Sequence, residues 1–594
     1  MLRTLICSLM FAPATLRAQA TPRIEYVLAV DSPDATSFQV EMRVRAAPDT
    51  LHLAMATHPE YDDRYWRYVR DVRAESGGQP LPVVRTDSAR WRVVLPGGNA
   101  VVRYRVEPPV VESRGSWVTY LSPTGGQVGD LHSFMYPEGH ERAPARVSLR
   151  LPNGWTSATG LAPVNDSTYA AATLTELLDS PIMIGPLRRW QFNVAGVPHE
   201  IAFASSGTHA PFGTTALVHG LRRLVRESHD VFGAFPYRRF VFQVHEDAQA
   251  GLEHGNSVSL GASSEDLAHG AADFYDDAAH EYFHSWNEVA LRPAGWGGLT
   301  TQPSGPTREL WWMEGVTMYY SELLRRRAML PLPYATRRMQ LEHDVAQYLD
   351  RPANALVSPA QAGWESDSPS ETRELFPDVH LQGKLVGAML DLVVRDSTRN
   401  QRSLDDVMKA LYRERAHRGY TGADIQRAAE HTCSCDLTGF FASNVRSAGR
   451  LDFDRYLRAA GLRMMDSLIT ATDDSGRVLP DLRVWALVPE GETAPRLLVV
   501  QSDGAWARAG LRSGDRIVSW NGAAMDGMRE FRTKLRALQA GDEVALEVRR
   551  DGAMAHATVR VTPYQVHRVK LVPLTNATAR QRAVRRATML DRDT

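Results

Sequence analysis

The chain has 594 residues, of which 43% are hydrophobic and 23% charged, and its formal net charge is -1. This length predicts several domains, and the composition is that of ordinary globular proteins. The balanced charge gives no basis for binding nucleic acid or a strongly anionic surface, so we expect no nucleic-acid partner.

The first 20 residues have the pattern of a secretory signal peptide. Arg3 supplies a positive charge, residues 5–14 are mostly apolar, and Ala18-Gln19-Ala20 fits the small-x-small cleavage pattern. The alternative is a short buried helix. Because the apolar run is too short to span a membrane, we expect no transmembrane span. We expect a mature protein that begins near Thr21 and is exported to the periplasm or the outside of the cell.

Residues 21–190 predict an N-terminal β domain. The segments 24–30, 38–44 and 101–106 alternate apolar and polar residues, and Pro, Gly and Asp lie between such segments. This pattern is typical of short strands in a sandwich-like domain.

A polar cluster at residues 251–257 follows the apolar segment 240–244, which predicts a buried strand. Glu253 lies in this cluster. A carboxylate just beyond a strand can line a substrate cleft and bind a free amine. The alternative is an ordinary edge strand with exposed polar side chains.

The most informative motif is His-Glu-x-x-His at His280, Glu281 and His284. Residues four apart lie on one face of a helix, so both imidazoles can bind one zinc ion. Glu281 lies beside them, where its carboxylate can serve a zinc-bound water, whose pKa the metal lowers to about 7. The same letters also occur by chance in amphipathic helices whose histidines pack or face solvent.

A catalytic zinc needs a third protein ligand, and Glu314 is the best candidate. It follows His284 by 30 residues (314 minus 284), and a loop rich in Pro and Gly lies between them at residues 292–307. Its neighbours are apolar and aromatic, where an unpaired carboxylate is costly. The alternative is a solvent-facing Glu near a helix start. Residues 315–460 predict helices that wall the cleft.

Residues 478–564 predict a separate unit. Within residues 502–522, glycines allow tight turns, Ile517 and Val518 suit a strand, and Asn521-Gly522 suits a hairpin turn. This stretch resembles PDZ domains of bacterial proteases, which bind extended chain ends by adding a strand. The resemblance implies a peptide or a protein C-terminus as partner. The sequence leaves open whether this domain binds one or only braces the catalytic domain.

The chain has few cysteines and a basic end. Cys7 would leave with the signal peptide, and Cys433 and Cys435 would remain. A disulfide between cysteines so close would be strained, and the sequence does not choose between a disulfide and two thiols. For residues 565–594 we expect a solvated basic tail, with Arg580, Arg582, Arg585 and Arg586.

Three clusters, in this order, resemble the glycyl aminopeptidase family of zinc metallopeptidases, within the wider thermolysin-like group. The matching residues are Gly251-Leu252-Glu253-His254, His280-Glu281-Tyr282-Phe283-His284 with Trp286-Asn287, and Glu314-Gly315 with Thr317-Met318-Tyr319-Tyr320. The likeness covers residues 231–460. It implies that one zinc ion is held by His280, His284 and Glu314, that Glu281 is the general base, and that Glu253 holds the substrate's amino end.

The chain departs from the resembled family at one position. Related zinc aminopeptidases carry, downstream of the ligand Glu, a Tyr that donates to the oxyanion, and here His380 stands at the comparable place. An imidazole can also donate a hydrogen bond to an oxyanion, and it titrates nearer neutrality than a phenol. The alternative is an alignment in which His380 does not replace the Tyr.

We therefore expect a multidomain α+β protein. Its predicted parts are a signal peptide (1–20), an N-terminal β-sandwich-like domain (21–190), a thermolysin-like zinc peptidase domain with a helical part (191–460), a PDZ domain (478–564) and a basic tail (565–594).

The predicted function is that of an exported zinc aminopeptidase acting on peptides, and the family resemblance suggests N-terminal Gly or Ala. The alternatives are a metallo-endopeptidase and a non-catalytic, PDZ-bearing peptide-binding protein that keeps zinc structurally. The intact Glu281 argues against the latter, because a structural zinc site would not need it. The sequence leaves the side-chain preference and the oligomeric state open.

Overall fold

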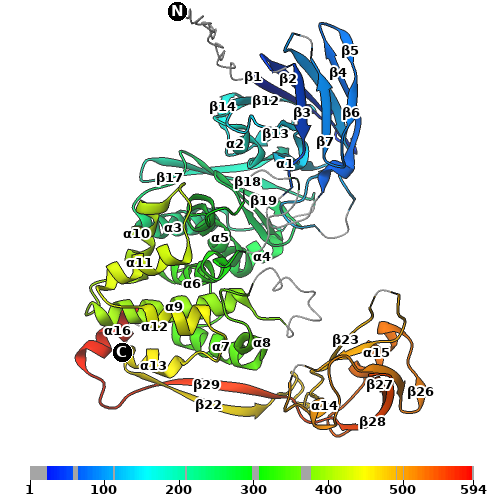
Figure 1. Cartoon of the computed structure of the whole chain (residues 1–594). Coiled ribbons are helices and arrows are strands. Elements are labelled where there is room, and N and C mark those ends of the chain that lie inside the picture. Colours follow the sequence, from blue (N-terminus) through cyan, green and yellow to red (C-terminus); the bar gives the residue numbers. More distant parts are fainter. Residues whose placement is uncertain are drawn as a thin grey trace, which may run out of the picture. The chain divides into compact units, whose positions relative to one another are not determined.

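The computed structural model describes residues 23–590, except residues 48, 58–63, 96, 111–113, 208–209, 298–300, 302–306, 363–375, 490 and 500. The expected signal peptide lies outside the described residues. The chain divides into two compact units (Figure 1). The first comprises Met1–Arg189, Ala202–Gly207 and Gly298–Pro303, and the second comprises Trp190–Ile201, Thr208–Gly297 and Ser304–Thr594. The expected multidomain α+β architecture is confirmed.

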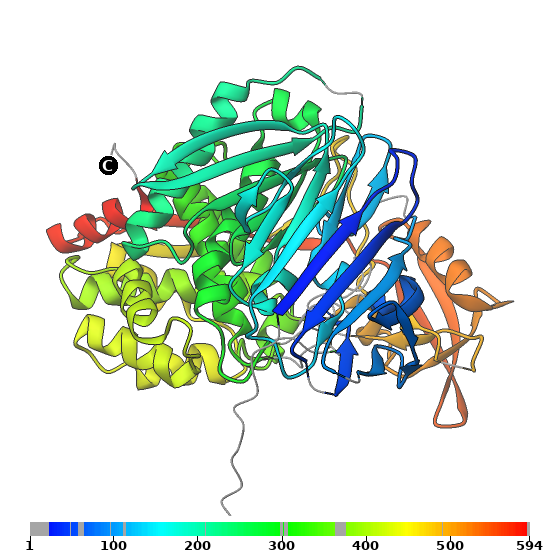
Figure 2. The same ribbon diagram turned by 90° about the horizontal axis from the view of Figure 1, so that it is seen from above.

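The first unit is built from three sheets. The largest has the strand order β14-β15-β12-β1-β2-β8-β4-β5, and its strands lie side by side in Figure 2. Two four-stranded sheets have the orders β13-β16-β10-β9 and β11-β3-β7-β6. The strands are β1 (Arg23–Ala29), β2 (Phe38–Arg45), β3 (Thr50–Ala54), β4 (Val69–Ser76), β5 (Gln79–Leu81), β6 (Val83–Arg85), β7 (Arg90–Val94), β8 (Ala100–Val106), β9 (Tyr120–Ser122), β10 (Gly125–Gly129), β11 (Tyr136–Pro137), β12 (Ala145–Arg150), β13 (Thr156–Ala158), β14 (Ala162–Asn165), β15 (Thr168–Ala171) and β16 (Pro181–Gly185).

Alternation along the strands explains the core of this unit. In β1, Ile24, Tyr26 and Leu28 are buried, while the residues between them are only partly so. Side chains alternate between the two faces of a strand, so these three point into one apolar core. The short helices α1 (Asp130–Ser133) and α2 (Leu174–Leu178) and the 3₁₀ turn η1 (Tyr65–Tyr68) join the strands.

A five-stranded sheet with the order β17-β18-β19-β21-β20 leads into the second unit. Its strands are β17 (Arg188–Val194), β18 (Val197–Ala204), β19 (Phe240–Glu246), β20 (Gly251–Glu253) and β21 (Ser257–Ala262). β20 is an edge strand, and helix α5 (Ala272–His284) packs on β20 and β21. The helices α3 (Thr214–Phe232) and α4 (Ser264–Ala268) complete this part.

The helical part is organised around α9 (Val379–Ser397), which contacts most of its neighbours. Three segments form π-helical turns, namely η2 (Ser285–Ala290), η3 (Trp311–Val316) and η6 (Ala442–Arg446). The remaining elements are α6 (Thr317–Arg327), α7 (Arg337–Asp350), α8 (Ala353–Leu356), α10 (Leu404–Arg415), α11 (Gly422–Cys433), α12 (Thr438–Phe441), α13 (Phe453–Leu457) and the 3₁₀ turn η7 (Arg458–Ala460). Among the described residues, no helix is both long and apolar enough to cross a membrane.

The predicted PDZ domain has its own apolar core, which runs from Val484 to Val561. Its sheet has the order β23-β24-β25-β27-β28, and β26 pairs with β25. Asn521 and Gly522 both have positive φ and connect β25 to β26, as the Asn-Gly pair predicts. The elements are β23 (Trp485–Leu487), β24 (Arg496–Leu498), β25 (Arg516–Trp520), β26 (Ala523–Ala524), β27 (Glu543–Arg550), β28 (Ala553–Arg560), α14 (Ala505–Arg508) and α15 (Gly527–Arg536).

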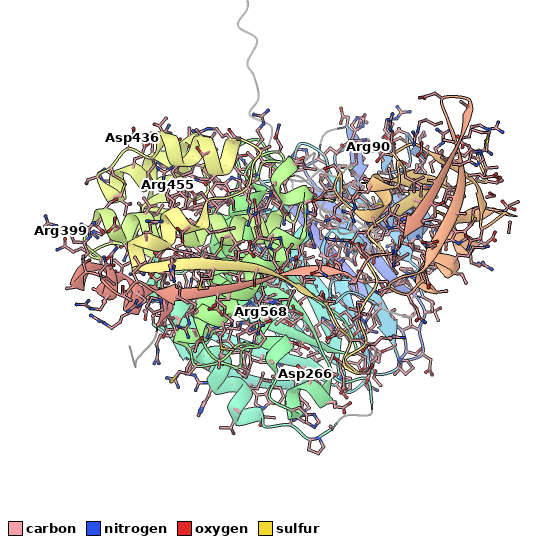
Figure 3. All side chains as sticks on the ribbon, turned by 90° about the horizontal axis from the view of Figure 1, so that it is seen from below. Arg90, Asp266, Arg399, Asp436, Arg455 and Arg568 are labelled. Carbon is pink, nitrogen blue, oxygen red and sulfur yellow. A yellow bond between two sulfur atoms is a disulfide. The ribbon has the colours of Figure 1, made fainter. Side chains whose placement is uncertain are left out.

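The segment 565–594, expected as a solvated tail, instead forms β29 (Gln565–Pro573) and α16 (Ala579–Met589) as far as it is described. β29 pairs along its whole length with β22 (Leu462–Thr470), and Arg568 marks this two-stranded ribbon in Figure 3. α16 buries Val584 and Met589 and contacts α9 and η7. The expectation was wrong because the arginines occupy only the outer face of an amphipathic helix.

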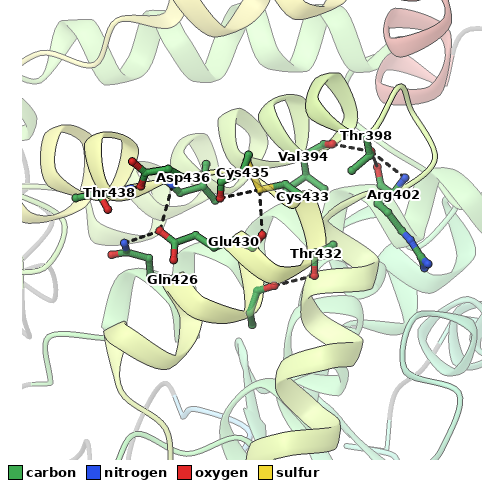
Figure 4. Close-up of a disulfide and its surroundings, with 12 residues drawn as sticks. Val394, Thr398, Arg402, Gln426, Glu430, Thr432, Cys433, Cys435, Asp436 and Thr438 are labelled. Atoms are coloured by element: carbon green, nitrogen blue, oxygen red, sulfur yellow. Dashed lines mark hydrogen bonds between the residues drawn. A yellow bond between two sulfur atoms is a disulfide. The ribbon is translucent and has the colours of Figure 1, made fainter.

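Cys433 and Cys435 form a disulfide at the C-terminal end of α11 (Figure 4). Their Cα atoms lie 5.2 Å apart, within the usual range for disulfides. Ser434 between them has a φ of 52°, and this left-handed residue makes the turn that brings the two cysteines together.

Candidate metal centre and active site

Helix α5 brings His280 and His284 together. The two residues are one turn apart, and their Nε2 atoms lie 3.0 Å from each other. Both Nε2 atoms face Glu314 on η3, whose Oε2 is 3.2 Å from that of His280 and 3.5 Å from that of His284. The structure thus gathers the three predicted metal ligands from two separate helical segments.

The donor set fits zinc. Bonds of about 2.0–2.1 Å to a tetrahedral zinc ion place neighbouring donor atoms about 3.3 Å apart. The separations of 3.0, 3.2 and 3.5 Å among the three side chains are close to that value. Two imidazole nitrogens and one carboxylate oxygen are also ligands that zinc takes in catalytic sites, with a fourth position left for water.

Asn287 ties α5 to the segment that carries Glu314. The helix breaks at Asn287 and Glu288, whose backbone angles are not helical. From this break the Asn287 amide nitrogen lies 2.9 Å from the Trp312 carbonyl oxygen and 3.0 Å from the Thr317 hydroxyl. The side chain is fully buried, so its donor hydrogens have no competing water. The sequence motif included Asn287 but did not indicate this role.

Glu288 orients His284. Its Oε2 lies 3.3 Å from His284 Nδ1, and the Asn287 carbonyl oxygen lies at the same distance from this nitrogen. A carboxylate on the far nitrogen of a ligating histidine holds the ring in one orientation. Burial raises the pKa of Glu288 to about 7. Sequence reasoning missed Glu288, although its position four residues after His284 was a usable signal.

The Glu314 carboxylate is strongly stabilised in its charged form. Burial alone would raise the pKa of Glu314, but the nearby His284 charge and hydrogen bonds from His280, His284 and His380 hold it well below the usual range. A charged carboxylate is the form that binds a metal.

The edge strand β20 passes directly beside Glu281. A Cβ atom on Gly251 would overlap the Glu281 side chain, so only glycine fits at this point. Glu253 is two residues further along the same strand and therefore points to the same side. Glu253 is nearly buried, and burial together with the Glu288 charge raises its pKa well above the ordinary value. Both predicted carboxylates thus face the metal site from neighbouring elements.

His380 lies at the start of α9, where its Nε2 is 3.1 Å from Glu314 Oε2. About a third of its side chain (35%) is exposed, so it borders open space as well as the ligand set. α9 approaches η3 so closely that a Cβ on Gly383 would lie 2.7 Å from the Gly315 Cα. This backbone contact between two glycines sets the position of His380.

A cavity of about 360 Å³ adjoins the metal site. Three of its lining residues, Asp276, Met318 and Lys384, lie one helical turn from His280, Glu314 and His380 respectively. The cavity is lined by Asp276, Met318, Glu322, Arg325, Pro333, Tyr334, Gln340, His343, Asp344, Gln347, Asp378, His380, Leu381 and Lys384. It therefore reaches the metal site at His380 and extends along α5 toward Asp276.

Known family models match three parts of the chain. The Peptidase M61 N-terminal domain matches residues 25–186, the M61 glycyl aminopeptidase matches residues 273–386, and a PDZ domain matches residues 486–561. These matches identify a peptidase. The predicted resemblance to the glycyl aminopeptidase family and the predicted PDZ domain are confirmed.

A solved structure shares the fold of this chain. An aminopeptidase N family protein from Idiomarina loihiensis has a TM-score of 0.75 at 20% identity, with 95% of this chain and 100% of that chain covered. An M1 zinc metallopeptidase from Deinococcus radiodurans has a TM-score of 0.47 at 16% identity, with 73% of this chain and 94% of that chain covered. No curated protein matches the sequence. The family match and the donor geometry together support a zinc aminopeptidase.

We expect Gly383→Ala to displace α9 from η3. The added methyl group would meet backbone atoms of Trp311 and Gly315, which cannot turn aside. Overpacking of this kind costs about 1–3 kcal/mol and would move His380. A lower Tm and a lower kcat check this, with Gly439→Ala as control, since nothing lies within 4 Å of a Cβ there. Equal Tm and kcat for the two variants would contradict the proposed contact.

Proposed function

We propose that the chain is an exported zinc aminopeptidase that removes small N-terminal residues, Gly or Ala, from peptides. The observation that carries this proposal is the arrangement of carboxylates around the three donor atoms. Glu281 follows His280 on the ligand helix, and Glu253 faces the same helix from the edge strand. Export is supported by the pattern of residues 1–20, and the substrate class by the matched glycyl aminopeptidase model.

Separate side chains perform the proton transfer and stabilise the developing charge in the proposed reaction. A zinc ion held by His280, His284 and Glu314 would supply Lewis-acid chemistry, polarising the scissile carbonyl and lowering the pKa of water near it. Glu281 takes the proton from the attacking water and delivers it to the leaving amine. His380 donates a hydrogen bond to the carbonyl oxygen as negative charge develops there.

The order of side chains along α5 suggests in which orientation a peptide binds. Asp276, His280 and His284 follow one another at intervals of four along one face of α5, and Glu288 lies beyond the end of α5, where it contacts His284. Glu253 lies at the Glu288 end, and the cavity opens at the Asp276 end. A peptide whose amine binds Glu253 would therefore place its first peptide bond at the ligands and the rest toward the cavity. This order favours an aminopeptidase over an endopeptidase.

The edge strand can hold the peptide backbone. β20 pairs with β21 on one side and ends the sheet on the other. An extended substrate can add to such an edge by main-chain hydrogen bonds. Gly251 and Glu253 then face the ligand helix from the strand next to the substrate. The backbone contacts and the amine contact together set which bond is cut.

Glu281→Gln should keep zinc but lose nearly all hydrolysis, because the carboxylate serves the water and not the metal. Glu314→Ala should instead lower the zinc content, since it removes one of the three donor atoms. Metal analysis and turnover of a Gly-initiated peptide check both variants. Near wild-type turnover in Glu281→Gln would exclude the general-base role, and full metallation of Glu314→Ala would exclude that ligand.

Glu253 should recognise the free amine of the substrate. An ammonium beside a carboxylate in a partly dry cleft gains a charge-assisted hydrogen bond. We expect free peptides to be cleaved much faster than acetylated ones, and Glu253→Ala to narrow the difference by slowing cleavage of the free peptide. If wild-type protein cleaves both peptides equally well, the endopeptidase alternative replaces the aminopeptidase.

His380→Ala should lower kcat by roughly 10²- to 10³-fold, as loss of one oxyanion donor does. KM and zinc content should change little, because His380 is proposed to act on the developing charge. His380→Tyr serves as the matched variant, since a phenol supplies a donor at the same place. Unchanged kcat in His380→Ala, or zinc loss that accounts for its fall, would remove His380 from the oxyanion role.

A further inference from the structure

Three arginines form a row across the PDZ sheet. Arg516 on β25 lies directly opposite Arg496 on β24 and Arg549 on β27. Side chains of directly opposed residues lie on the same face of a sheet, with Cβ atoms about 4.5–5.5 Å apart. Like charges in such pairs destabilise the sheet, and an arginine cannot relieve the repulsion by losing its proton.

The row forms part of a concave site. Two more arginines, Arg512 in the loop before β25 and Arg550 at the end of β27, lie beside it. These five arginines line a cavity of about 440 Å³. We call this cavity the arginine pocket, and it is lined by Arg496, Arg512, Ser513, Gly514, Asp515, Arg516, Arg549, Arg550, Asp551 and Gly552. Five arginines and two aspartates give it a formal charge of +3, whereas the whole chain has a net charge of -1.

The pocket's own carboxylates leave most of this charge uncompensated. Asp515 is buried and engaged by Arg550, with nitrogen–oxygen distances of 2.6 and 2.7 Å. Arg496 pairs with Glu492 outside the pocket at 2.6 Å. Within the described part of the chain, no carboxylate forms an ion pair with Arg512, Arg516 or Arg549. Three guanidinium groups are therefore available to a ligand.

The pocket is separate from the place where a PDZ domain adds a strand. Strand addition needs a sheet edge, and the edges of this sheet are β23 and β28. The arginines come from β24, β25, β27 and one loop. A ligand in the pocket would therefore contact side chains at the ends of central strands.

We propose that the arginine pocket binds an acidic peptide segment through two or more of its carboxylates. Guanidinium groups bind carboxylates in pairs of parallel hydrogen bonds, and Arg516 and Arg549 of the row, with Arg512 beside it, fit adjacent acidic residues. A pocket of about 440 Å³ admits side chains, while a membrane surface would need a broad basic face. The net charge of -1 also gives the chain no general attraction to anionic surfaces.

The test uses the full chain and a fluorescent peptide with four consecutive Asp residues, acetylated and amidated so that both ends are blocked. Its Asn counterpart is the control peptide. We expect the Asp peptide to bind at least tenfold more tightly, and the difference to shrink as salt rises. Arg516→Gln with Arg549→Gln should weaken binding at least tenfold. Arg560→Gln, which removes one charge from the same sheet outside the pocket, should leave binding unchanged.

Two further measurements separate the possible results. Without ligand, Arg516→Gln should raise Tm, because it relieves the repulsion within the row; a lower Tm would mean that the row is structural and would overturn the proposal. Binding of vesicles rich in phosphatidylglycerol, or of inorganic phosphate, without binding of the Asp peptide would also overturn it.

Hydrolysis of a neutral Gly peptide is measured in parallel and should be equal in all variants. Binding is read without turnover, so failure of the proposed peptidase function would be seen separately.

Discussion

The proposed active site depends on two contacts that leave room only for glycine. At Gly251 the edge strand touches the Glu281 side chain, and at Gly383 helix α9 touches the backbone of η3 at Gly315. These contacts bring together four segments that are far apart in the sequence: β20, α5, η3 and α9. A methyl group at either position would have to displace packed atoms, the Glu281 side chain at Gly251 and the backbone of η3 at Gly383. The positions of Glu253 and His380 relative to His280, His284 and Glu314 therefore depend on glycine at positions 251 and 383.

The same closeness concentrates charge that would be unfavourable without a cation. Glu253, Glu281, Glu288 and Glu314 lie in or beside one site that also holds His284. Burial raises the pKa of the first three, while histidine contacts lower that of Glu314. Carboxylates crowded in this way are the arrangement expected where a metal ion and a substrate ammonium supply the opposite charge. The binding of such cations explains the cluster of four carboxylates better than a contribution to the stability of the fold does.

The sequence predicted what depends on local spacing. His280 and His284 could be paired because a helix repeats every 3.6 residues, and the hairpin turn at Asn521 could be recognised from its residue types. The prediction of Glu314 as the third ligand needed a further assumption, namely that a loop and a second helix bring the chain back to the two histidines. The helix break at Asn287, its bonds to η3, and the glycine contacts depend on which segments meet in space, which no spacing rule contains. The prediction of a solvated basic tail was wrong for a related reason. The arginines are evident in the sequence, but the apolar face opposite them is buried only because α16 packs on α9.

The C-terminal part shows how one chain connects two separately folded cores. β22 leaves the helical part, β29 returns to it, and the domain between them has a core of its own. The ribbon is fastened to α7, where Glu342 accepts hydrogen bonds from the Leu571 backbone and the Lys570 ammonium at 2.9 and 3.0 Å. Because both strands are held at the same end, the inserted domain has no free terminus. A peptide bound in it would stay tethered to the peptidase, so its local concentration near the active site would be set by the ribbon and not by diffusion through the solution.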